Sequence, residues 1–574
     1  MRKSRENRLK KPASFVRTSF GLLVVAATSS LGVVASGTAA SADPAPLTVA
    51  TGFQPADLVV NVGADATQMS ITWFSAAGSG TPQVRVGSKA PVSGTDGAVA
   101  TDSSRRWNKV TVTGLVPGTT YTFTVSDDGV DYSQQYSFTT AGSGAFSFAA
   151  VGDPQIGSAS PTDSPASIAA ASASWSATVA EIQAKGASFV VGTGDQIENA
   201  GQSAADVAVK GQEYTGFLAG LDQGGSMVPF APALGNHEGD GSSTTIVGRG
   251  LYGEHYDAPH QMTDVVNGLP LQDYFYTVNG VLYVVLDTAA YPSDAAAAAP
   301  YVSAFDHTLA TATSTYAGKY SWLVVQTHKS QMSNASHWND TDIRAYSQAG
   351  FEDLMTKYGV DLALTGHDHA YTRTYPLKSS YTTVGTGGPL VADGVTADPN
   401  NTGDVLEDPD GTVYMVLDSA TGSKYYSLHQ PPKATSKVEY QGNVPEYTMV
   451  DVTSGSLTVT TYEVGNSKVV DRFTIDKTAP TPENAITVTS VATSGNGQAD
   501  VCFPIRSANG KGYTVLVSTT GAPGSFTVAD ANFNSKGAHV KGLKAGTTYY
   551  VYVQYADSTT TERSDVVTVV VPAK

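Results

Sequence analysis

Five short apolar runs in the middle of this 574-residue chain each end in residues that bind metal ions. Such a run is typical of a buried strand, and the polar residues come directly after its carboxyl end. In open α/β sheets the loops at the carboxyl ends of the strands converge on one edge, where ligand sites lie. The pattern therefore predicts one site that is assembled from five distant parts of the chain. The runs and their blocks are Phe146–Val151 with Gly152-Asp153, Phe189–Val191 with Gly194-Asp195, Pro229–Leu234 with Gly235-Asn236-His237-Glu238, Trp322–Gln326 with His328, and Asp361–Leu364 with Gly366-His367-Asp368-His369.

The blocks are spaced as strand–helix–strand units would space them. The intervals are 42, 41, 92 and 39 residues, counted from Asp153 through Asp195, Asn236 and His328 to His367. Carboxylate, amide and imidazole groups without thiolate suit iron, manganese or zinc. The six candidate ligands exceed what one tetrahedral ion needs, whereas two metal ions that share a carboxylate would use all of them. The glycine of the last block permits the turn that brings both of its histidines to one site.

The alternation of apolar and polar residues divides the chain into three parts. Residues 47–142 and 483–574 contain alternating runs between Gly, Pro, Asp and Ser clusters, which predicts an all-β module at each end. Residues 144–476 mix strand and helix patterns and predict an α/β domain, with a β-hairpin at Asn279-Gly280. Helices are expected at Pro165–Lys185, Ala204–Leu221 and Thr341–Lys357.

The two end modules share a short repeat. Gly114–Tyr121 recurs as Gly542–Tyr549 with six identical residues in eight. Both copies precede an alternating run, and they resemble the corner of fibronectin type III-like sandwiches, where a tyrosine phenol bonds back to the backbone. We therefore interpret Tyr121 and Tyr549 as structural residues.

The first 42 residues have the pattern of a secretory signal peptide. A basic N-terminal stretch precedes the apolar stretch Phe20–Ala35, and Ala40-Ser41-Ala42 offers a small-residue cleavage site. A membrane anchor is the alternative interpretation, but the apolar stretch is short for a span and is interrupted by polar residues and Gly32. The sequence therefore predicts a secreted protein with no membrane span in the mature chain.

The predicted mature chain is strongly acidic. Residues 1–42 hold seven basic residues and one acidic residue, so their removal changes the formal net charge from −17 to −23. Such a surface repels nucleic acid backbones and anionic membranes, so no nucleic-acid binding is expected. An anionic substrate would then be captured by local positive charge, most simply by metal ions. Cys502 is the single cysteine, which excludes an intramolecular disulfide and a thiolate metal cluster.

Together the blocks resemble the calcineurin-like metallophosphoesterases, and among them the purple acid phosphatases. The order GD, GD, GNHE, H and GHxH is that of the family, whose N-terminal fibronectin-like module ends in an SFTT strand, here Ser137–Thr140. The resemblance covers about residues 47–475. It implies a multidomain protein in which an α/β metallophosphoesterase domain, with two mixed β-sheets flanked by helices, lies between two all-β fibronectin type III-like sandwiches.

The resemblance also implies two metal ions per chain and assigns each ligand. His237 and His337 fall where the family has histidines that contact the phosphate or protonate the leaving group. Asp368 is interpreted as a spacer between the two histidines of its block. By the resemblance, Asp153 and His369 would bind the first metal, Asn236, His328 and His367 would bind the second, and Asp195 would bridge them.

Two positions depart from the family pattern, and both concern the first metal. Purple enzymes have a tyrosine three residues after the bridging aspartate, whose phenolate binds ferric iron and gives the colour; here that residue is Glu198. The wider superfamily has Asp-x-His in the first block, where this chain has Asp153-Pro154-Gln155. The amide oxygen of Gln155 and the carboxylate of Glu198 are the candidate replacements, with Glu198 equally open to an outer, non-ligating role. We expect a protein that is not purple.

Other basic residues are expected outside the site. His255, His260 and His307 are interpreted as surface groups, and Arg249 and Arg373 as members of salt bridges. The function expected from all these features is a secreted phosphoesterase that hydrolyses small phosphomonoesters by attack of metal-bound hydroxide. A phosphodiesterase or nucleotidase with the same site is the alternative. The third interpretation is a non-catalytic surface-binding or adhesion protein, in which the two sandwiches bind and the α/β domain is inert. The C-terminal module is a candidate for contact with an extracellular polymer or surface.

Overall fold

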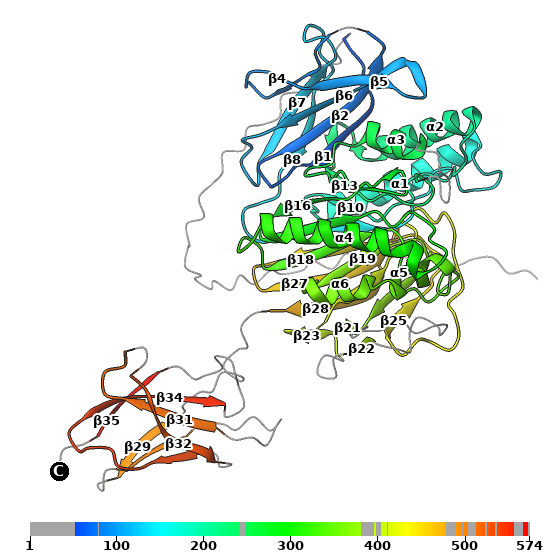
Figure 1. Ribbon diagram of the computed structural model, residues 1–574. Coiled ribbons are helices and arrows are strands. Elements are labelled where there is room, and N and C mark those ends of the chain that lie inside the picture. The colour runs from blue at the N-terminus through cyan, green and yellow to red at the C-terminus, as the bar shows by residue number, and fades with distance from the viewer. Residues whose placement is uncertain are drawn as a thin grey trace, which may run out of the picture. The chain divides into compact units, whose positions relative to one another are not determined.

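The computed structural model describes three folded parts, which Figure 1 shows in order of colour from blue to red. Among the described residues, no helix combines the length and the apolar character needed to cross a membrane. The predicted signal peptide lies outside the described residues. The structure describes residues 52–571 except 79, 240–246, 380–394, 398–402, 410, 478–489, 495–497, 503–512, 523–524, 534–536 and 556–565.

The N-terminal part is an all-β module, as predicted. Its strands are β1 (Ala56–Val62), β2 (Met69–Ala76), β3 (Gln83–Val86), β4 (Val92–Ser93), β5 (Thr95–Val99), β6 (Asp102–Val112), β7 (Thr120–Ser126) and β8 (Tyr136–Thr139). Strands β1, β2, β6 and β5 lie in one sheet and β8, β7, β3 and β4 in another. The backbone amide of Val116 donates to the Tyr121 hydroxyl at 2.8 Å, so the predicted tyrosine corner is present.

One sheet runs from the N-terminal module into the central α/β domain. It adds β9 (Phe146–Val151), β10 (Val190–Gly192), β13 (Phe230–Pro232), β23 (Val405–Glu407), β26 (Glu446–Val452), β27 (Ser456–Glu463) and β28 (Val469–Asp476). The strand order is β23-β28-β27-β26-β9-β10-β13-β1-β2-β6-β5. Strands β9, β10 and β13 are parallel neighbours, so their carboxyl ends lie at the same edge.

A second sheet completes the central domain. Its strands are β16 (Tyr274–Val278), β17 (Val281–Leu286), β18 (Trp322–Thr327), β19 (Leu362–Thr365), β20 (Tyr371–Thr374), β24 (Val413–Val416) and β25 (Ser436–Tyr440). They follow the order β16-β17-β18-β19-β24-β20-β25, with β17, β18, β19 and β24 parallel. Strands β16 and β17 form the predicted hairpin, and Asn279 and Gly280 adopt φ angles of 45° and 84° that such a turn requires. The remaining short pairs are β11 (Asp222–Gln223) with β12 (Ser226–Met227), β14 (Val265–Val266) with β15 (Leu269–Pro270), and β21 (Leu377–Ser379) with β22 (Val395–Ala397).

Helices cover the outer faces of both sheets, so the predicted architecture of two mixed sheets flanked by helices is confirmed (Figure 1). They are α1 (Pro165–Ala184), α2 (Ala204–Gly220), α3 (Val247–His255), α4 (Ala295–Thr315), α5 (Thr341–Gln348) and α6 (Phe351–Tyr358). Ser164 caps α1 and Ser203 caps α2 in a capping box with Asp206. The single helix predicted at Thr341–Lys357 is wrong: Gly350 has a φ of 97° and separates α5 from α6.

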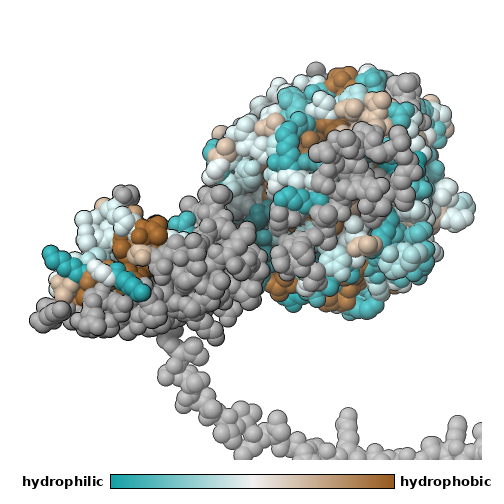
Figure 2. All heavy atoms as spheres, turned by 60° about the horizontal axis from the view of Figure 1, so that its bottom comes forward, coloured by the Kyte–Doolittle hydropathy of each residue, from teal (hydrophilic) through white to brown (hydrophobic). Residues whose placement is uncertain are grey.

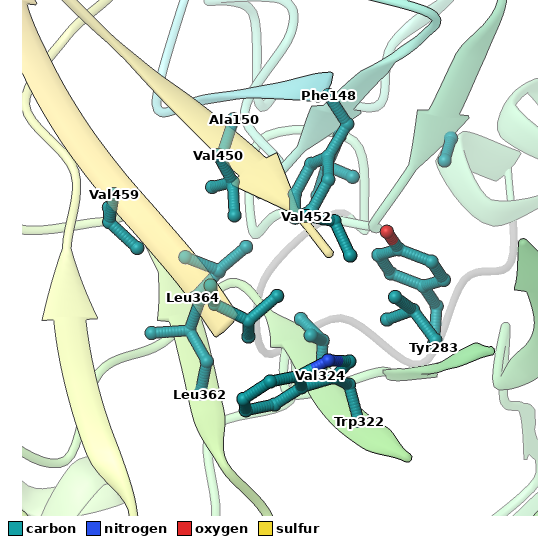
Figure 3. Packing of buried hydrophobic residues seen from close by; sticks show 14 of the residues in the cluster. Phe148, Ala150, Tyr283, Trp322, Val324, Leu362, Leu364, Val450, Val452 and Val459 are labelled. Carbon is teal, nitrogen blue, oxygen red and sulfur yellow. The ribbon is translucent and has the colours of Figure 1, made fainter. Parts of the chain in front are cut away.

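The main core lies between the two sheets. Phe148 and Ala150 of β9 face the second sheet, whereas Ala149 and Val151 face α1 and α2, because successive strand residues point to opposite sides. Figure 3 shows Phe148 packed among side chains of both sheets, including Tyr283. This core fixes the carboxyl edges of both sheets relative to each other.

The C-terminal part is a β-sheet module in its described residues. Its strands are β29 (Ser490–Ser494), β30 (Gln498–Cys502), β31 (Tyr513–Ser518), β32 (Thr527–Phe533), β33 (Gly537–Val540), β34 (Thr548–Tyr555) and β35 (Val567–Val570). They form sheets of the order β29-β30-β33 and β32-β31-β34-β35. The Lys544 amide donates to the Tyr549 hydroxyl at 2.9 Å, so the repeated sequence forms the same corner as in the N-terminal module.

The described surface carries no large apolar patch in the view of Figure 2. Polar residues are spread over this face, and hydrophobic residues occur in small, separate groups.

Candidate metal centre

All five predicted blocks meet at the carboxyl edges of the two sheets. Strands β9, β10 and β13 of the first sheet and β18 and β19 of the second each end directly before one block. Four of the assigned ligands have a left-handed backbone: φ is 44° at Asp153, 50° at Asp195, 73° at His367 and 28° at His369. Non-glycine residues adopt this conformation at a cost in free energy, and such strain is concentrated at functional sites.

The donors assigned to the second metal converge on His328. Its Nε2 lies 2.9 Å from Asn236 Oδ1 and 3.2 Å from His367 Nδ1. The distance from Nε2 to Asp195 Oδ2 is 3.3 Å. His328 Nδ1 donates to the carbonyl oxygen of Thr193 at 2.9 Å, so a neutral ring presents a lone pair at Nε2. Oxygen and nitrogen lone pairs that face each other in this way fit a metal cation.

The electrostatics of this cluster require a positive charge. Burial lowers the pKa of His328, but the Asp195 carboxylate and its neighbours outweigh burial and raise it to about 9. His328 and His237 hold the pKa of Asp195 well below its ordinary value despite burial. A proton on His328 meets this requirement, and a metal ion would take its place.

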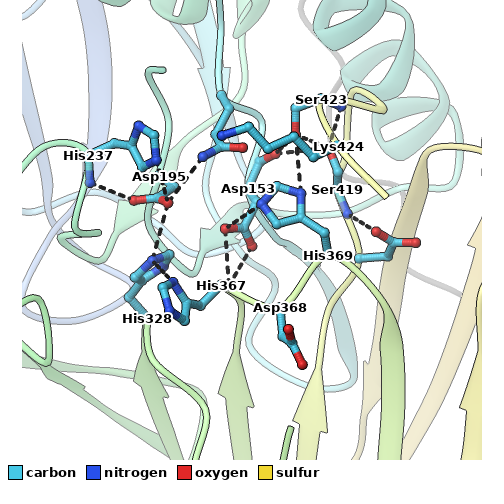
Figure 4. A network of polar contacts seen from close by, with 12 residues as sticks. Asp153, Asp195, His237, His328, His367, Asp368, His369, Ser419, Ser423 and Lys424 are labelled. Carbon is cyan, nitrogen blue, oxygen red and sulfur yellow. Dashed lines mark hydrogen bonds and ion pairs between the residues drawn. The ribbon is translucent and has the colours of Figure 1, made fainter. Parts of the chain in front are cut away.

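Asp195 contacts both His237 and His328, as the dashed lines of Figure 4 show. Its Oδ2 accepts from Gln155 Nε2 at 3.3 Å and lies 3.8 Å from His237 Nε2. Its Oδ1 accepts from the His237 amide at 2.9 Å. The carboxylate therefore contacts His328 of the second-metal half and Gln155, a candidate ligand of the first metal, as expected of a bridging ligand.

In the first-metal half the assigned ligands lie farther apart than in the second-metal half. His369 Nε2 lies 3.7 Å from Asp153 Oδ1, and the Asp153 carboxylate accepts from the His367 amide at 2.8 and 3.0 Å. Burial raises the pKa of Asp153 well above its usual value. Burial also lowers the pKa of His369, with help from the Lys424 charge, to about 3. A buried carboxyl group beside a neutral imidazole is a fitting pair of ligands for the first metal ion, which would replace the carboxyl proton on binding.

The two candidate replacements at the first metal differ in their partners. Gln155 is buried, and its Oε1 has no hydrogen-bond partner among the described residues. Glu198 Oε2 likewise has no hydrogen-bond partner among the described residues, but it lies 3.0 Å from the Lys424 ammonium in an ion pair. An unpartnered buried amide oxygen next to Asp195 fits a metal ligand, whereas a carboxylate in an ion pair fits an outer role.

The two histidines predicted to act on the substrate lie beside the ligands. His237 Nδ1 contacts the backbone oxygen of Glu198. His337 stacks on His367 with ring centroids 4.1 Å apart, and its Nδ1 contacts Asp340 Oδ2 at 2.6 Å. The His337 side chain is 28% exposed, so it lies at the solvent side of the centre.

Asp368 points away from the ligands, as Figure 4 shows, but it is more than a spacer. Its carboxylate accepts from the backbone amides of Ala335 at 2.6 Å and His337 at 2.7 Å. It therefore fixes the loop that presents His337.

The sequence did not reveal three supporting elements. Glu238 accepts from the backbone amides of Asp195, Ile197 and Gly235 and so fixes two ligand turns at once. The position of Glu238 in the GNHE block is the sequence feature that could have indicated this role. Lys210 donates to the carbonyl oxygen of His237 at 2.8 Å from α2, a contact without a sequence motif.

The third element is the segment from Ser419 to Tyr426, which follows β24. The hydroxyl groups of Ser419 and Ser423 donate to the Asp153 carbonyl oxygen at 2.9 and 3.0 Å. The Tyr426 amide donates to the carbonyl oxygen of His369 at 3.1 Å. This segment holds both residues assigned to the first metal.

Five basic residues were expected to lie outside the site, as salt-bridge partners or as surface groups, and four of them match that expectation. The expected salt bridges of the two arginines are confirmed, Arg249 with Asp287 and Arg373 with Asp471. The prediction of a surface position for His255 is wrong. Its exposure is 1%, because the ring packs between Phe74 of the N-terminal module and Tyr214 of α2. The other two are accessible: His307 keeps 58% of its side chain exposed and His260 is an exposed residue.

Comparison with known proteins agrees with this geometry. Residues 55–140 match the purple acid phosphatase N-terminal domain, and residues 146–371 match the calcineurin-like phosphoesterase family. The purple acid phosphatase from yellow lupin (Lupinus luteus) seeds has a similar structure, with a TM-score of 0.54 over 74% of each chain at 15% sequence identity. That likeness shows a shared fold.

Curated relatives match short segments. An uncharacterised protein of Mycobacterium tuberculosis is 32% identical over 104 residues, which are 18% of each chain. An acid phosphatase of Aspergillus ficuum is 38% identical over 64 residues, or 11% of this chain and 10% of the other. The chain thus spans less than a fifth of the length of these relatives. The family matches, the two sheets and the converging blocks together show that the chain contains a purple acid phosphatase N-terminal domain followed by a calcineurin-like metallophosphoesterase domain.

Proposed function

We propose that this protein is a secreted phosphatase that hydrolyses small phosphomonoesters at a centre of two metal ions. The observation that carries the proposal is the convergence of Asn236, His367 and Asp195 on Nε2 of His328 within 3.3 Å. Such a donor set is suited to iron, manganese or zinc. Secretion rests on the predicted signal peptide alone.

The bound metal ions would supply the attacking hydroxide and neutralise the phosphoryl oxygens. Asn236, His328 and His367 would hold the second ion, Asp153 and His369 the first, and Asp195 both. The short contacts at His328 and the backbone bonds to Asp153 keep these ligands in place before substrate arrives. Little reorganisation is then needed during the reaction.

The proton chemistry falls to two histidines. Asp340 fixes His337 through Nδ1 and would stabilise its protonated form. The other ring nitrogen of His337 is left for a leaving-group oxygen. His237, held by Glu198 at Nδ1, faces Asp195 with Nε2 and would contact the phosphoryl group.

The first metal would have an unusual environment for a purple acid phosphatase relative. With Glu198 in an ion pair, we assign the Gln155 amide oxygen as its further ligand. No phenolate is part of this ligand set, so we expect a colourless protein. An intense visible charge-transfer band in the pure protein would contradict this assignment.

Hydrolysis of aryl phosphates by the purified protein tests the proposal. The unaltered protein should hydrolyse a model aryl monoester, and a chelator should abolish the reaction until metal is restored. Asp195→Ala should be inactive, while Lys357→Met, on the outer helix α6, should match the unaltered protein. Hydrolysis that survives both chelation and Asp195→Ala would refute the proposal.

A further inference from the structure

Lys424 brings an accessible positive charge to the first-metal half of the centre. Its side chain is 30% exposed, and its ammonium pairs with Glu198 at 3.0 Å. Two other lysines near the centre, Lys210 and Lys329, are fully buried and donate to backbone carbonyl oxygens. Lys210 and Lys329 therefore have structural roles, whereas Lys424 is accessible to an anion from solvent.

Glu198 connects Lys424 to the histidine that would contact the phosphoryl group. Its carboxylate pairs with Lys424, and its backbone oxygen contacts His237 Nδ1. His237 Nε2 lies 3.8 Å from Asp195 Oδ2. Glu198 thus contacts both the Lys424 ammonium and the His237 imidazole, and the imidazole lies beside the bridging carboxylate.

The anchoring of its segment makes Lys424 a part of the centre rather than of a free loop. The preceding residue, Ser423, donates to the Asp153 carbonyl oxygen and lies 3.4 Å from His369 Nδ1. Figure 4 shows Lys424 in the same network as Ser423 and Asp153. The Lys424 charge also contributes, after burial, to the low pKa of His369.

We propose that Lys424 is a substrate-binding residue that contacts a terminal oxygen of the phosphoryl group, with Glu198 as its positioning residue. An ammonium has three donor hydrogens, so an ion pair with one carboxylate leaves donors for a second anion. This inference rests on the proposed function and narrows its substrate class.

The charge of Lys424 distinguishes the two classes of phosphate ester. A monoester carries close to two negative charges at neutral pH and has three terminal oxygens, whereas a diester carries one charge and has two. An additional cation beside the metal ions stabilises the more highly charged group. Lys424 therefore makes the centre selective for phosphomonoesters over diesters.

Calorimetric titration of the metal-loaded protein with inorganic phosphate tests this role. Lys424→Met should weaken phosphate binding by roughly 10- to 100-fold, the loss expected for one charge-assisted hydrogen bond, while the metal content per chain stays unchanged. Lys424→Arg should retain most of the affinity, and Glu198→Gln should lose less than Lys424→Met. The ratio of monoester to diester hydrolysis should fall with the phosphate affinity.

Lys357→Met is the matched control, because Lys357 also pairs with a carboxylate, that of Asp306, on the outer helices at 2.5 Å. It should bind phosphate as the unaltered protein does. If the unaltered protein hydrolyses monoesters but Lys424→Met binds phosphate with the same affinity, the role of Lys424 is overturned and the proposed function stands. Loss of a metal ion from Lys424→Met would overturn this role too, because Lys424 would then act in metal retention. A metal-loaded, unaltered protein that neither binds phosphate nor hydrolyses esters would overturn the proposed function as well.

Discussion

The two halves of the metal centre share a sheet edge and a bridging carboxylate but are built in different ways. In the second-metal half, the donors come from the ends of β10, β13, β18 and β19 and lie within 3.3 Å of His328 Nε2. In the first-metal half, His369 and Asp153 are 3.7 Å apart. Their neighbours include the segment after β24, which is not part of the predicted series, as well as the His367 amide.

This difference ties metal retention mainly to the second-metal half and substrate recognition mainly to the first-metal half. Strand ends are fixed by the core between the sheets, so they hold ligands in a set geometry. The segment after β24 is fixed by a core only at its start, where Ser419 and Ala420 are buried, whereas residues 421–426 are half-buried. We infer that the second half is the stable base of the centre, and that the first half carries the departures from the family pattern, Gln155 and Glu198, together with Lys424.

The largest effect is expected from His367→Ala. Its ring completes the cluster around His328, so its loss should remove the second metal and lower hydrolysis by more than the roughly 100-fold that loss of an outer partner costs. Metal analysis and aryl phosphate hydrolysis of the same preparation check this. Tyr121→Phe, which removes only the phenol of the N-terminal corner, should leave both unchanged. Retention of two metals by His367→Ala would break the distinction between the halves.

A smaller effect is expected from changes at Gln155. Gln155→Leu should weaken binding of the first metal by about 10- to 100-fold and leave the second in place. Gln155→His, which restores the imidazole of the wider superfamily, should strengthen it. Titration with a divalent metal, followed by metal counting after dialysis, measures both. Identical affinities in the three proteins would show that the amide oxygen is no ligand.

The pH dependence of the metal-stripped protein should report on the second half. The pKa of His328 is raised from 6.5 to about 9, so the protonated ring stabilises the fold fully below pH 6.5. That stabilisation is lost as the pH rises through about 9. The thermal midpoint should therefore fall over this range in the stripped protein and stay level in the metal-loaded one, where the metal replaces the proton. If the thermal midpoint changes with pH in the same way in the stripped and the metal-loaded protein, the proton on His328 does not take the place of a metal ion.

The smallest effect is expected from Asp368→Ala. The carboxylate fixes the loop of His337 through two backbone amides, and its loss should lower hydrolysis by about 10-fold with both metals retained. Kinetics with a poor and a good leaving group refine the result. Since His337 would protonate the leaving oxygen, the loss should be greater for the poor one. An equal loss for both leaving groups would remove His337 from that step.

Much of this centre could be predicted from the sequence, because its signals are local. An apolar run followed by a glycine and a metal-binding residue, as in Gly194-Asp195, encodes a strand, its turn and its ligand within a few positions. The hairpin at Asn279-Gly280 and the cap at Ser203 are local in the same sense. The repeat around Tyr121 and Tyr549 predicted a corner that both modules form.

The parts that could not be predicted depend on contacts between distant elements. Lys424 reaches Glu198 because β24 lies next to β19 in the sheet, a neighbour relation that no motif records. His255 is buried because the N-terminal module packs against α2 and covers it. The sequence shows a glycine at position 350, but it does not show that this glycine adopts a positive φ and separates α5 from α6.

Calorimetric titration of metal into the stripped protein measures both halves of the centre in one experiment. We expect two binding events per chain, of which His367→Ala removes one and Gln155→Leu weakens the other. A single binding event, or two events that respond equally to both substitutions, would contradict a centre built from two distinct halves.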